Sequence, residues 1–341
     1  MAFESIAHEL SKVDDVEVTL FGSGQARTED RYKFKHIPNI SRVCFESFPK
    51  LPVLRSYYAY EEMTFVAGLI GKYNSQDFDI TVSCTYPFTN WFLKAFNGKQ
   101  KSANIFVTQN GDYPANSNHL EFRYFSCDGL VCTNPDYFER NKDKWNAALI
   151  PNGVNPNLFA PGQRNRAKFD LPEDVPLVLM TSALIPYKRV LDGIRAVSQL
   201  KGVHLIICGD GSEREQVMAL GEQLMPGRFY LMKLPSNQMP DIYRAADVFL
   251  HMSLYEPFGN VYVEALATGL PVIAHRNQVT QWICAETEFL IDTENELEVL
   301  KGLRKAFNVG NNIIEHRNQI KARFAWENIA KQYLDFFETV I

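Results

Sequence analysis

The sequence predicts an α/β protein with two domains, each built around a parallel sheet. Short apolar, β-branched runs alternate with longer segments of helical period, and this alternation occurs twice along the chain. The length of 341 residues supports the same division, because an ordinary domain holds roughly 150 residues. The chain is therefore long enough to bury two hydrophobic cores.

The first half is predicted to alternate between strands and helices after an opening helix at 3–12. No strand and no glycine-rich strand-to-helix turn precede this helix, although the first strand of such a sheet is usually central. The expected first strand of this domain is thus missing. We expect either that the true start codon lies upstream or that this copy of the protein is truncated. The remaining predicted strands are 16–21, 80–84, 104–108 and 129–132, and the remaining helices are 57–73, 89–97 and 136–141.

The second half repeats the pattern after a connecting segment at 150–162. This segment is dense in Pro, Gly and Asn, which favours irregular structure. We therefore expect domains at 1–153 and 154–325. Helices are expected between the strands of the second half, which are predicted at 177–182, 203–208, 229–233, 248–252 and 272–274.

Composition narrows the class of protein. The net charge is −5, whereas a nucleic-acid-binding domain usually carries an excess of basic residues. We interpret the cluster Arg31, Lys33, Lys35 as a solvated face. No apolar run approaches the roughly 18 residues of a membrane span, and the first residues do not form a secretory signal. The six cysteines include no C-x-x-C pair, which favours reduced thiols. We therefore expect a cytoplasmic protein.

The strongest functional signal is the segment at 253–274, which reads SLYEPFGNVYVEALATGLPVIA. Gly259 has no side chain to block an approaching group, and a helix opening near Asn260 would direct backbone amides at an anion. Glu264 shares a helix face with Asn260 and could accept both hydroxyls of a ribose. Glu256 could receive sugar hydroxyls at the strand end. Isolated glutamates are usually surface residues, but the Pro-Phe-Gly-Asn turn between these two favours a site.

This segment resembles the E-x7-E region of the retaining glycosyltransferases of family 4. Those enzymes have the GT-B fold, in which two Rossmann-like domains face each other across a cleft. Further segments of the chain are also similar to that family, while the first half matches only in its general α/β pattern. These segments are 150–155, 181–189, 206–212 and 239–247.

The resemblance implies a role for each matching residue. Glu264 would hold the donor ribose, Glu256 would contact the transferred sugar, and Lys188 would neutralise the donor pyrophosphate. Lys188 and Glu256 are accordingly the predicted catalytic residues. The remaining predicted donor-binding residues, several of which would offer backbone amides, are Ser182, Arg189, Phe258, Gly259, Asn260 and Val261.

Two departures from the family pattern stand out. Many relatives carry an arginine where this chain has Ala183; Arg189 is a candidate for the missing charge, with a salt bridge on the following helix as an equal alternative. Relatives also carry a histidine in the turn at 109–114, where this chain has none. Asn110 and Asp112 are candidates for positioning sugar hydroxyls there, although Asn-Gly-Asp is also typical of an ordinary turn.

The resemblance implies retaining transfer of a sugar from a nucleoside-diphosphate sugar to an acceptor hydroxyl. The expected setting is polysaccharide or glycolipid synthesis. We expect a carbohydrate or lipid-linked acceptor, contact with the inner face of the membrane, no nucleic-acid partner, and neither metal nor other cofactor. The helix at 326–341 would pack back on the first domain.

The alternative functions are those of a catalytically silent or truncated nucleotide-sugar-binding protein and of a GT-B epimerase or phosphorylase. A dehydrogenase is disfavoured because no early G-x-G-x-x-G follows a strand.

Overall fold

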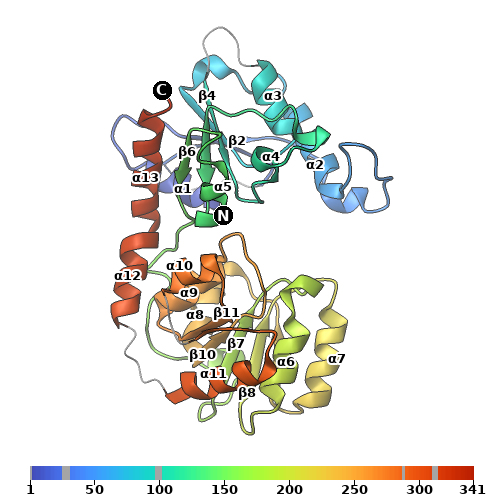
Figure 1. Cartoon of the computed structure of the whole chain (residues 1–341), viewed down its shortest axis with the longest axis vertical. Helices are drawn as coiled ribbons and strands as arrows, with labels where there is room; N and C mark the ends of the chain where they lie inside the picture. Colours follow the sequence, from blue (N-terminus) through green and yellow to red (C-terminus); the bar gives the residue numbers. More distant parts are fainter. Residues whose placement is uncertain (1, 25–30, 97–101, 286–288, 309–313) are drawn as a thin grey trace. The chain divides into compact units, whose positions relative to one another are not determined.

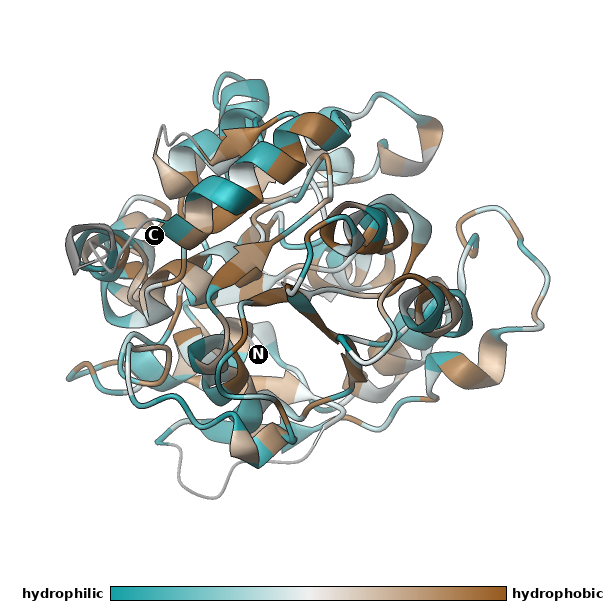
Figure 2. Cartoon of the chain, turned by 90° about the horizontal axis from the view of Figure 1, so that it is seen from below, coloured by the Kyte–Doolittle hydropathy of each residue, from teal (hydrophilic) through white to brown (hydrophobic). Residues whose placement is uncertain are grey.

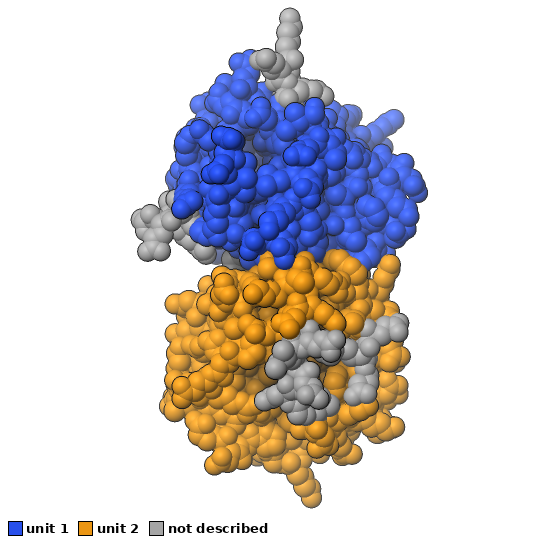
Figure 3. Space-filling model, turned by 90° about the vertical axis from the view of Figure 1, so that its left-hand side faces the viewer, with its two compact units in different colours: residues 1–152, 326–341 blue, residues 153–325 orange. Residues whose placement is uncertain are grey.

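The chain divides into two compact units (Figure 3). Unit 1 comprises the residues up to Asn152 together with Trp326–Ile341, and unit 2 comprises Gly153–Ala325. The computed structural model describes residues 2–24, 31–96, 102–285, 289–308 and 314–341, and every structural statement below refers to these ranges. All strand pairs in both units are parallel, so the predicted α/β class is confirmed.

Unit 2 contains a six-stranded sheet with β7 and β10 at its centre (Figure 1). Adjacent strands in the middle of a parallel sheet are buried on both faces, which explains the continuous apolar run of β7. The sheet order is β12-β11-β10-β7-β8-β9, with β7 at Leu177–Thr181, β8 at His204–Cys208, β9 at Phe229–Met232, β10 at Val248–Leu250, β11 at Val272–His275 and β12 at Leu290–Ile291. The two-residue strand β12 was not predicted.

Helices cover both faces of this sheet. In β7, Leu177 and Leu179 join one hydrophobic core, while Val178 and Met180 join the other, because successive side chains of a strand point to opposite faces. The hydrophobic colour in Figure 2 accordingly lies on the strands and the inner faces of the helices. The first core includes α8 (Met239–Ala245), α9 (Asn260–Thr268), α10 (Gln278–Cys284) and α12 (Ile314–Phe324), and the second includes α6 (Val190–Ser198), α7 (Arg214–Leu224) and α11 (Glu296–Asn308).

Unit 1 contains a four-stranded sheet and a separate two-stranded one. The larger sheet has the order β3-β4-β5-β6, with β3 at Ile80–Ser83, β4 at Ala103–Val107, β5 at Gly129–Cys132 and β6 at Ala147–Leu149. The smaller sheet pairs β1 (Thr19–Gly22) with β2 (Lys33–His36). Neither β2 nor β6 was predicted, and the strand expected at 16–21 begins only at Thr19. Lys33 and Lys35 are exposed on β2, as expected for a solvated face.

The first and last helices of the chain pack together in unit 1. Ile6 and Leu10 of α1 (Ala2–Leu10) share a hydrophobic core with Ile329 and Tyr333 of α13 (Trp326–Glu338). A side chain at Gly129 of β5 would come within 3.0 Å of Phe336 on α13, so the small residue lets this helix approach the sheet. The opposite face carries α4 (Tyr113–Asn116) and α5 (Pro135–Asn141).

The remaining helices of unit 1 are α2 (Tyr57–Leu69) and α3 (Phe88–Phe96). The predicted helices end later than these, at 73 and 97, and residue 97 lies outside the described residues. No described helix combines the length and the apolar character needed to cross a bilayer.

Candidate functional site

The candidate site lies at the carboxyl edge of the sheet in unit 2. The chain leaves β7 through the turn that holds Lys188, and it leaves β10 through the segment 251–259 that leads into α9. Because β7 and β10 are adjacent and parallel, both segments start at the same edge of the sheet, where open α/β sheets bind their ligands. Lys188 Nζ forms an ion pair with Glu256 Oε1. The fold thus brings together the two residues that were predicted as catalytic.

His251 is the third member of this cluster, and it was not predicted from the sequence. Its Nε2 lies 2.7 Å from Glu256 Oε1, the same oxygen that contacts Lys188. Burial alone would raise the pKa of the Glu256 carboxyl, but the hydrogen bond and charge of His251 and the charge of Lys188 outweigh it, so that this pKa lies below its ordinary value. The cluster therefore holds a buried, ionised carboxylate.

Aromatic side chains fix the His251 ring. The ring stacks on Phe249, with 6.2 Å between centroids, and contacts the edge of Tyr262 at 5.2 Å. The sequence carried one weak signal for this residue, which is a polar side chain directly after the apolar strand β10. Only its contact with Glu256, five residues further on, shows its relation to the site.

The turn before α9 requires glycine. Gly259 adopts a φ of +79°, and a Cβ there would lie 2.5 Å from the Tyr262 ring. The side chain of Phe258 is buried against Trp282 and Phe324, which anchors the turn in the core. The first amides of a helix lack intrahelical acceptors and attract anions. The backbone at 259–261 therefore suits a phosphate.

Glu264 lies one helical turn further along α9. Its Oε2 accepts a hydrogen bond of 2.9 Å from the Tyr243 hydroxyl, which in turn lies 2.9 Å from Thr181 Oγ1 at the end of β7. Burial raises the pKa of Glu264 to about 7, and the hydrogen bond from Tyr243 opposes this effect. A carboxyl with a perturbed pKa at a ligand-binding edge is a candidate for function, and its predicted role at the donor ribose stays a prediction.

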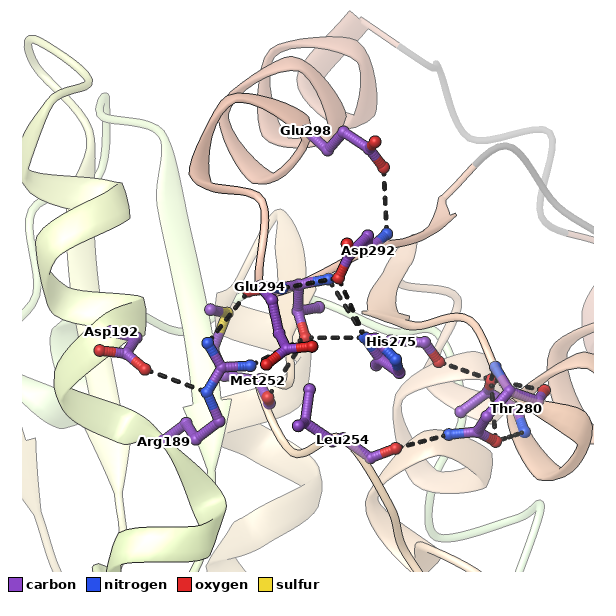
Figure 4. A network of polar contacts seen from close by, with 11 residues as sticks. Arg189, Asp192, Met252, Leu254, His275, Thr280, Asp292, Glu294 and Glu298 are labelled. Atoms are coloured by element: carbon purple, nitrogen blue, oxygen red, sulfur yellow. Dashed lines mark hydrogen bonds and ion pairs between the residues drawn. The ribbon is translucent and has the colours of Figure 1, made fainter.

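Arg189 is held by a polar network (Figure 4). Its Nε donates to Asp192 at 3.0 Å, and its Nη2 donates to the carbonyl of Thr293 at 3.3 Å. His275 also contacts Thr293, through Nδ1. Of the two alternatives for Arg189, the structure contains the salt bridge on the following helix, and the role at the pyrophosphate remains a prediction without a contact that supports it.

Three other predicted residues have local partners. Ser182 Oγ donates to the carbonyl of Ala183 at 3.0 Å. In unit 1, Asp112 is buried and its carboxylate accepts hydrogen bonds from Arg140 and Asn141. Asn110 is exposed, and its amide lies 3.5 Å from the carbonyl of Cys84. These contacts tie the turn that holds Asp112 to α5, whereas a role of Asn110 or Asp112 at a sugar remains a prediction.

The fold and the site together define a two-domain α/β protein with a candidate ligand-binding edge on its second unit. Residues 162–324, which make up nearly all of that unit, match the family model described as "Glycosyl transferases group 1". Unit 2 is therefore similar to that family, in agreement with the resemblance predicted from the sequence.

Known relatives and solved structures agree with this assignment. The chain is 33% identical to the lipopolysaccharide core biosynthesis glycosyltransferase LpsE of Rhizobium meliloti (strain 1021) over 224 residues, which cover 64% of this chain and 62% of the relative. It therefore spans less than two thirds of that relative's length. Over 143 residues, 39% of this chain and 33% of the relative, it is 34% identical to D-inositol 3-phosphate glycosyltransferase of Mycolicibacterium smegmatis.

Two solved structures show the fold of the whole chain. Sucrose-phosphate synthase from Thermosynechococcus elongatus superposes with a TM-score of 0.79 at 19% identity, covering 99% of this chain and 92% of that chain. The Anabaena protein HepE, solved with UDP and glucose, superposes with a TM-score of 0.73 at 18% identity, covering 99% and 96%. The predicted GT-B fold is confirmed.

Proposed function

We propose that this chain is a glycosyltransferase that moves a sugar from a nucleoside-diphosphate sugar to an acceptor hydroxyl. One observation carries the proposal: Lys188 and Glu256 meet at the carboxyl edge of a glycosyl transferases group 1 domain, beside the first turn of α9. A cation, a carboxylate and a helix N-terminus are the groups needed to hold a diphosphate and an attached sugar.

The contacts suggest how the donor enters this site. Lys188 would exchange its bond with Glu256 for one with the donor diphosphate, and the first amides of α9 would bind the β-phosphate. Glu256 would keep its contact with His251 and accept a hydroxyl of the transferred sugar. Each of these groups stabilises the negative charge that grows on the leaving diphosphate or orients the sugar beside it.

We further propose that transfer retains the anomeric configuration and needs no metal ion. The departing β-phosphate would receive the acceptor proton on the face where the acceptor attacks, so no protein nucleophile is required. Lys188 and the amides of α9 supply the positive groups that a cation would otherwise provide. The anomeric coupling constant of the product and the rate after treatment with EDTA test these two statements.

The relatives suggest the setting of the reaction. LpsE is described as acting in lipopolysaccharide core biosynthesis, and HepE was solved with UDP. We propose, on this basis, a carbohydrate or lipid-linked acceptor in envelope glycan synthesis, reached at the inner membrane surface. The same likeness makes UDP the first nucleotide to test.

Thermal unfolding with UDP, GDP and ADP tests the donor site. A ligand at one hundred times its Kd stabilises the folded chain by about 2.7 kcal/mol, and Glu264→Ala should abolish the shift. Glu222→Ala, which removes an exposed glutamate on α7, is the matched control and should keep it. A folded chain that responds to none of the three nucleotides would contradict the proposal, while binding without transfer would indicate a silent nucleotide-sugar-binding protein.

A further inference from the structure

Glu264 stands at the end of a short chain of hydrogen bonds. The Tyr243 hydroxyl of α8 donates to Glu264 Oε2, and it lies 2.9 Å from Thr181 Oγ1 at the end of β7. An ionised carboxyl can only accept hydrogen bonds, and a tyrosine hydroxyl carries a single proton. Tyr243 therefore donates its proton to Glu264, and Thr181 donates to the oxygen of Tyr243.

The Tyr243 ring is fixed in the core of unit 2. It is fully buried, and it packs against Phe159 and Phe249 with 5.7 Å between centroids in each pair. Glu264, by contrast, is partly exposed, so a ligand can reach it. A carboxylate offers about four lone-pair sites, and Tyr243 uses one of them. The fixed ring thus holds one oxygen of the carboxylate and leaves acceptor sites for a ligand.

The hydrogen bond from Tyr243 also favours the ionised form of Glu264. Burial raises the pKa of this carboxyl to about 7, and the bond from Tyr243 lowers it. Two hydroxyls of a ribose are donors, and the ionised carboxyl can accept both. The protonated form has fewer acceptor sites, because one of its oxygens carries a proton. Tyr243 therefore favours the protonation state that a pair of hydroxyls requires.

No other described charged group acts on this carboxyl. Burial and the Tyr243 bond are the two effects on the pKa of Glu264 among the described residues. The elements α8, α10, α12 and β11 pack on α9, and α10 carries no charged side chain. Cys208 lies near Tyr243, but burial raises the pKa of its thiol to about 12, so it stays neutral. The other elements carry Asp241 and Arg244, which pair with each other, His275, which contacts Thr293, Arg323, which binds the carbonyl of Trp282, Lys321, which is exposed, and Arg317, which lines a cavity with Pro176 and Pro271.

We propose that Tyr243 is a positioning residue that makes Glu264 selective for the two adjacent hydroxyls of a ribose. Its hydroxyl fixes the carboxylate, so a nucleotide that lacks the 2′-hydroxyl leaves one side of Glu264 without a partner. A charged acceptor without a partner is costly, and the preferred donor class is therefore a ribonucleoside diphosphate rather than its 2′-deoxy form. The inference rests on the proposed function, since it takes Glu264 as the residue that holds the donor ribose.

Calorimetric titration with UDP and 2′-deoxy-UDP tests this selectivity, or the same pair with the base that gives the thermal shift. The parent chain should prefer the ribonucleotide at least about tenfold at neutral pH. Tyr243→Phe keeps the ring but removes the hydroxyl, and it should lower this preference to about threefold or less. The matched control is Tyr230→Phe, which removes a hydroxyl that contacts His204 and should keep the preference of the parent.

The pH dependence of UDP binding separates positioning from packing. Binding should tighten as the pH rises through about 7, where Glu264 ionises. In Tyr243→Phe the same rise should occur at higher pH, because the bond that lowers the pKa of Glu264 is gone. UDP titrates alike with both proteins, so the difference between them reports on the chain. Thr181→Val keeps the shape of the side chain but removes the donor to Tyr243, and it should shift the rise in the same direction by less.

Two results would overturn the proposal. A parent chain that binds UDP and 2′-deoxy-UDP equally well would remove Glu264 from the ribose and leave glycosyl transfer intact, whereas a chain that binds no nucleotide would contradict both proposals. The second result is a folded Tyr243→Phe variant that keeps the preference and the pH profile of the parent, which would make Tyr243 a core residue only. If Tyr243→Phe does not fold, Thr181→Val decides alone, and an unshifted profile overturns the inference.

Discussion

Replacing Glu264 by Gln should remove a pH dependence of stability that arises at the proposed donor site. The ordinary pKa of a glutamate is 4.5, and burial raises the pKa of Glu264 to about 7. Each pH unit between these values is worth about 1.4 kcal/mol, so ionising this carboxyl should cost the folded state about 3 kcal/mol. A raised carboxyl pKa contributes stability that is fully present below pH 4.5 and is lost as the pH rises to 7.

The assay is urea unfolding of the parent chain and Glu264→Gln at several pH values from 4.5 to 8. All other titrating groups are common to both proteins, so the difference in unfolding free energy should isolate Glu264. Relative to the variant, the parent should lose about 3 kcal/mol across this range, while the amide keeps the bond from Tyr243. A difference that does not change with pH would refute the inference that this carboxyl is buried with a raised pKa.

Three further predictions concern side chains with fixed partners. His251→Phe should keep the aromatic packing but remove the hydrogen bond to Glu256, and steady-state kinetics should show kcat reduced about tenfold with KM nearly unchanged. Lys188→Met should lower kcat/KM at least about a hundredfold, and a retained rate would exclude Lys188 from the pyrophosphate. Arg166→Met should lower the free energy of unfolding, measured in urea, by about 3 to 5 kcal/mol. The reason is that this buried side chain binds several backbone carbonyls and Asp247. A change below about 1 kcal/mol would contradict that role.

The sequence predicted those parts of the fold that rest on local pattern. β5 was predicted with its observed bounds, and the buried strands of unit 2 were found because a strand covered on both faces reads as a continuous apolar run. Strands β6 and β12 were missed because three and two residues are too short to show a period. Strand β2 was missed because its alternate lysines indicated only a solvated surface.

Among the side chains of the candidate site, too, only those in a local sequence motif were predicted. Lys188, Glu256 and Glu264 were identified because they lie in segments with a recognisable motif. His251 and Tyr243 were not, since their importance comes from partners brought near by the fold. The direction of the Arg189 side chain depends on Thr293, more than one hundred residues away in the chain, and no neighbouring residue indicates that contact.

The place of α13 makes unit 1 discontinuous along the chain. Unit 1 begins at the amino terminus but is completed by the final helix, so unit 2 is topologically an insertion within it. Domains usually fold as units during synthesis, with the amino-terminal one first. Here Ile329 and Tyr333 can cover the core that contains Ile6 and Leu10 only after unit 2 has been synthesised. Unit 2 can therefore fold on the nascent chain before α13 completes the core of unit 1, and a deletion within α13 would damage the unit whose first part was made first.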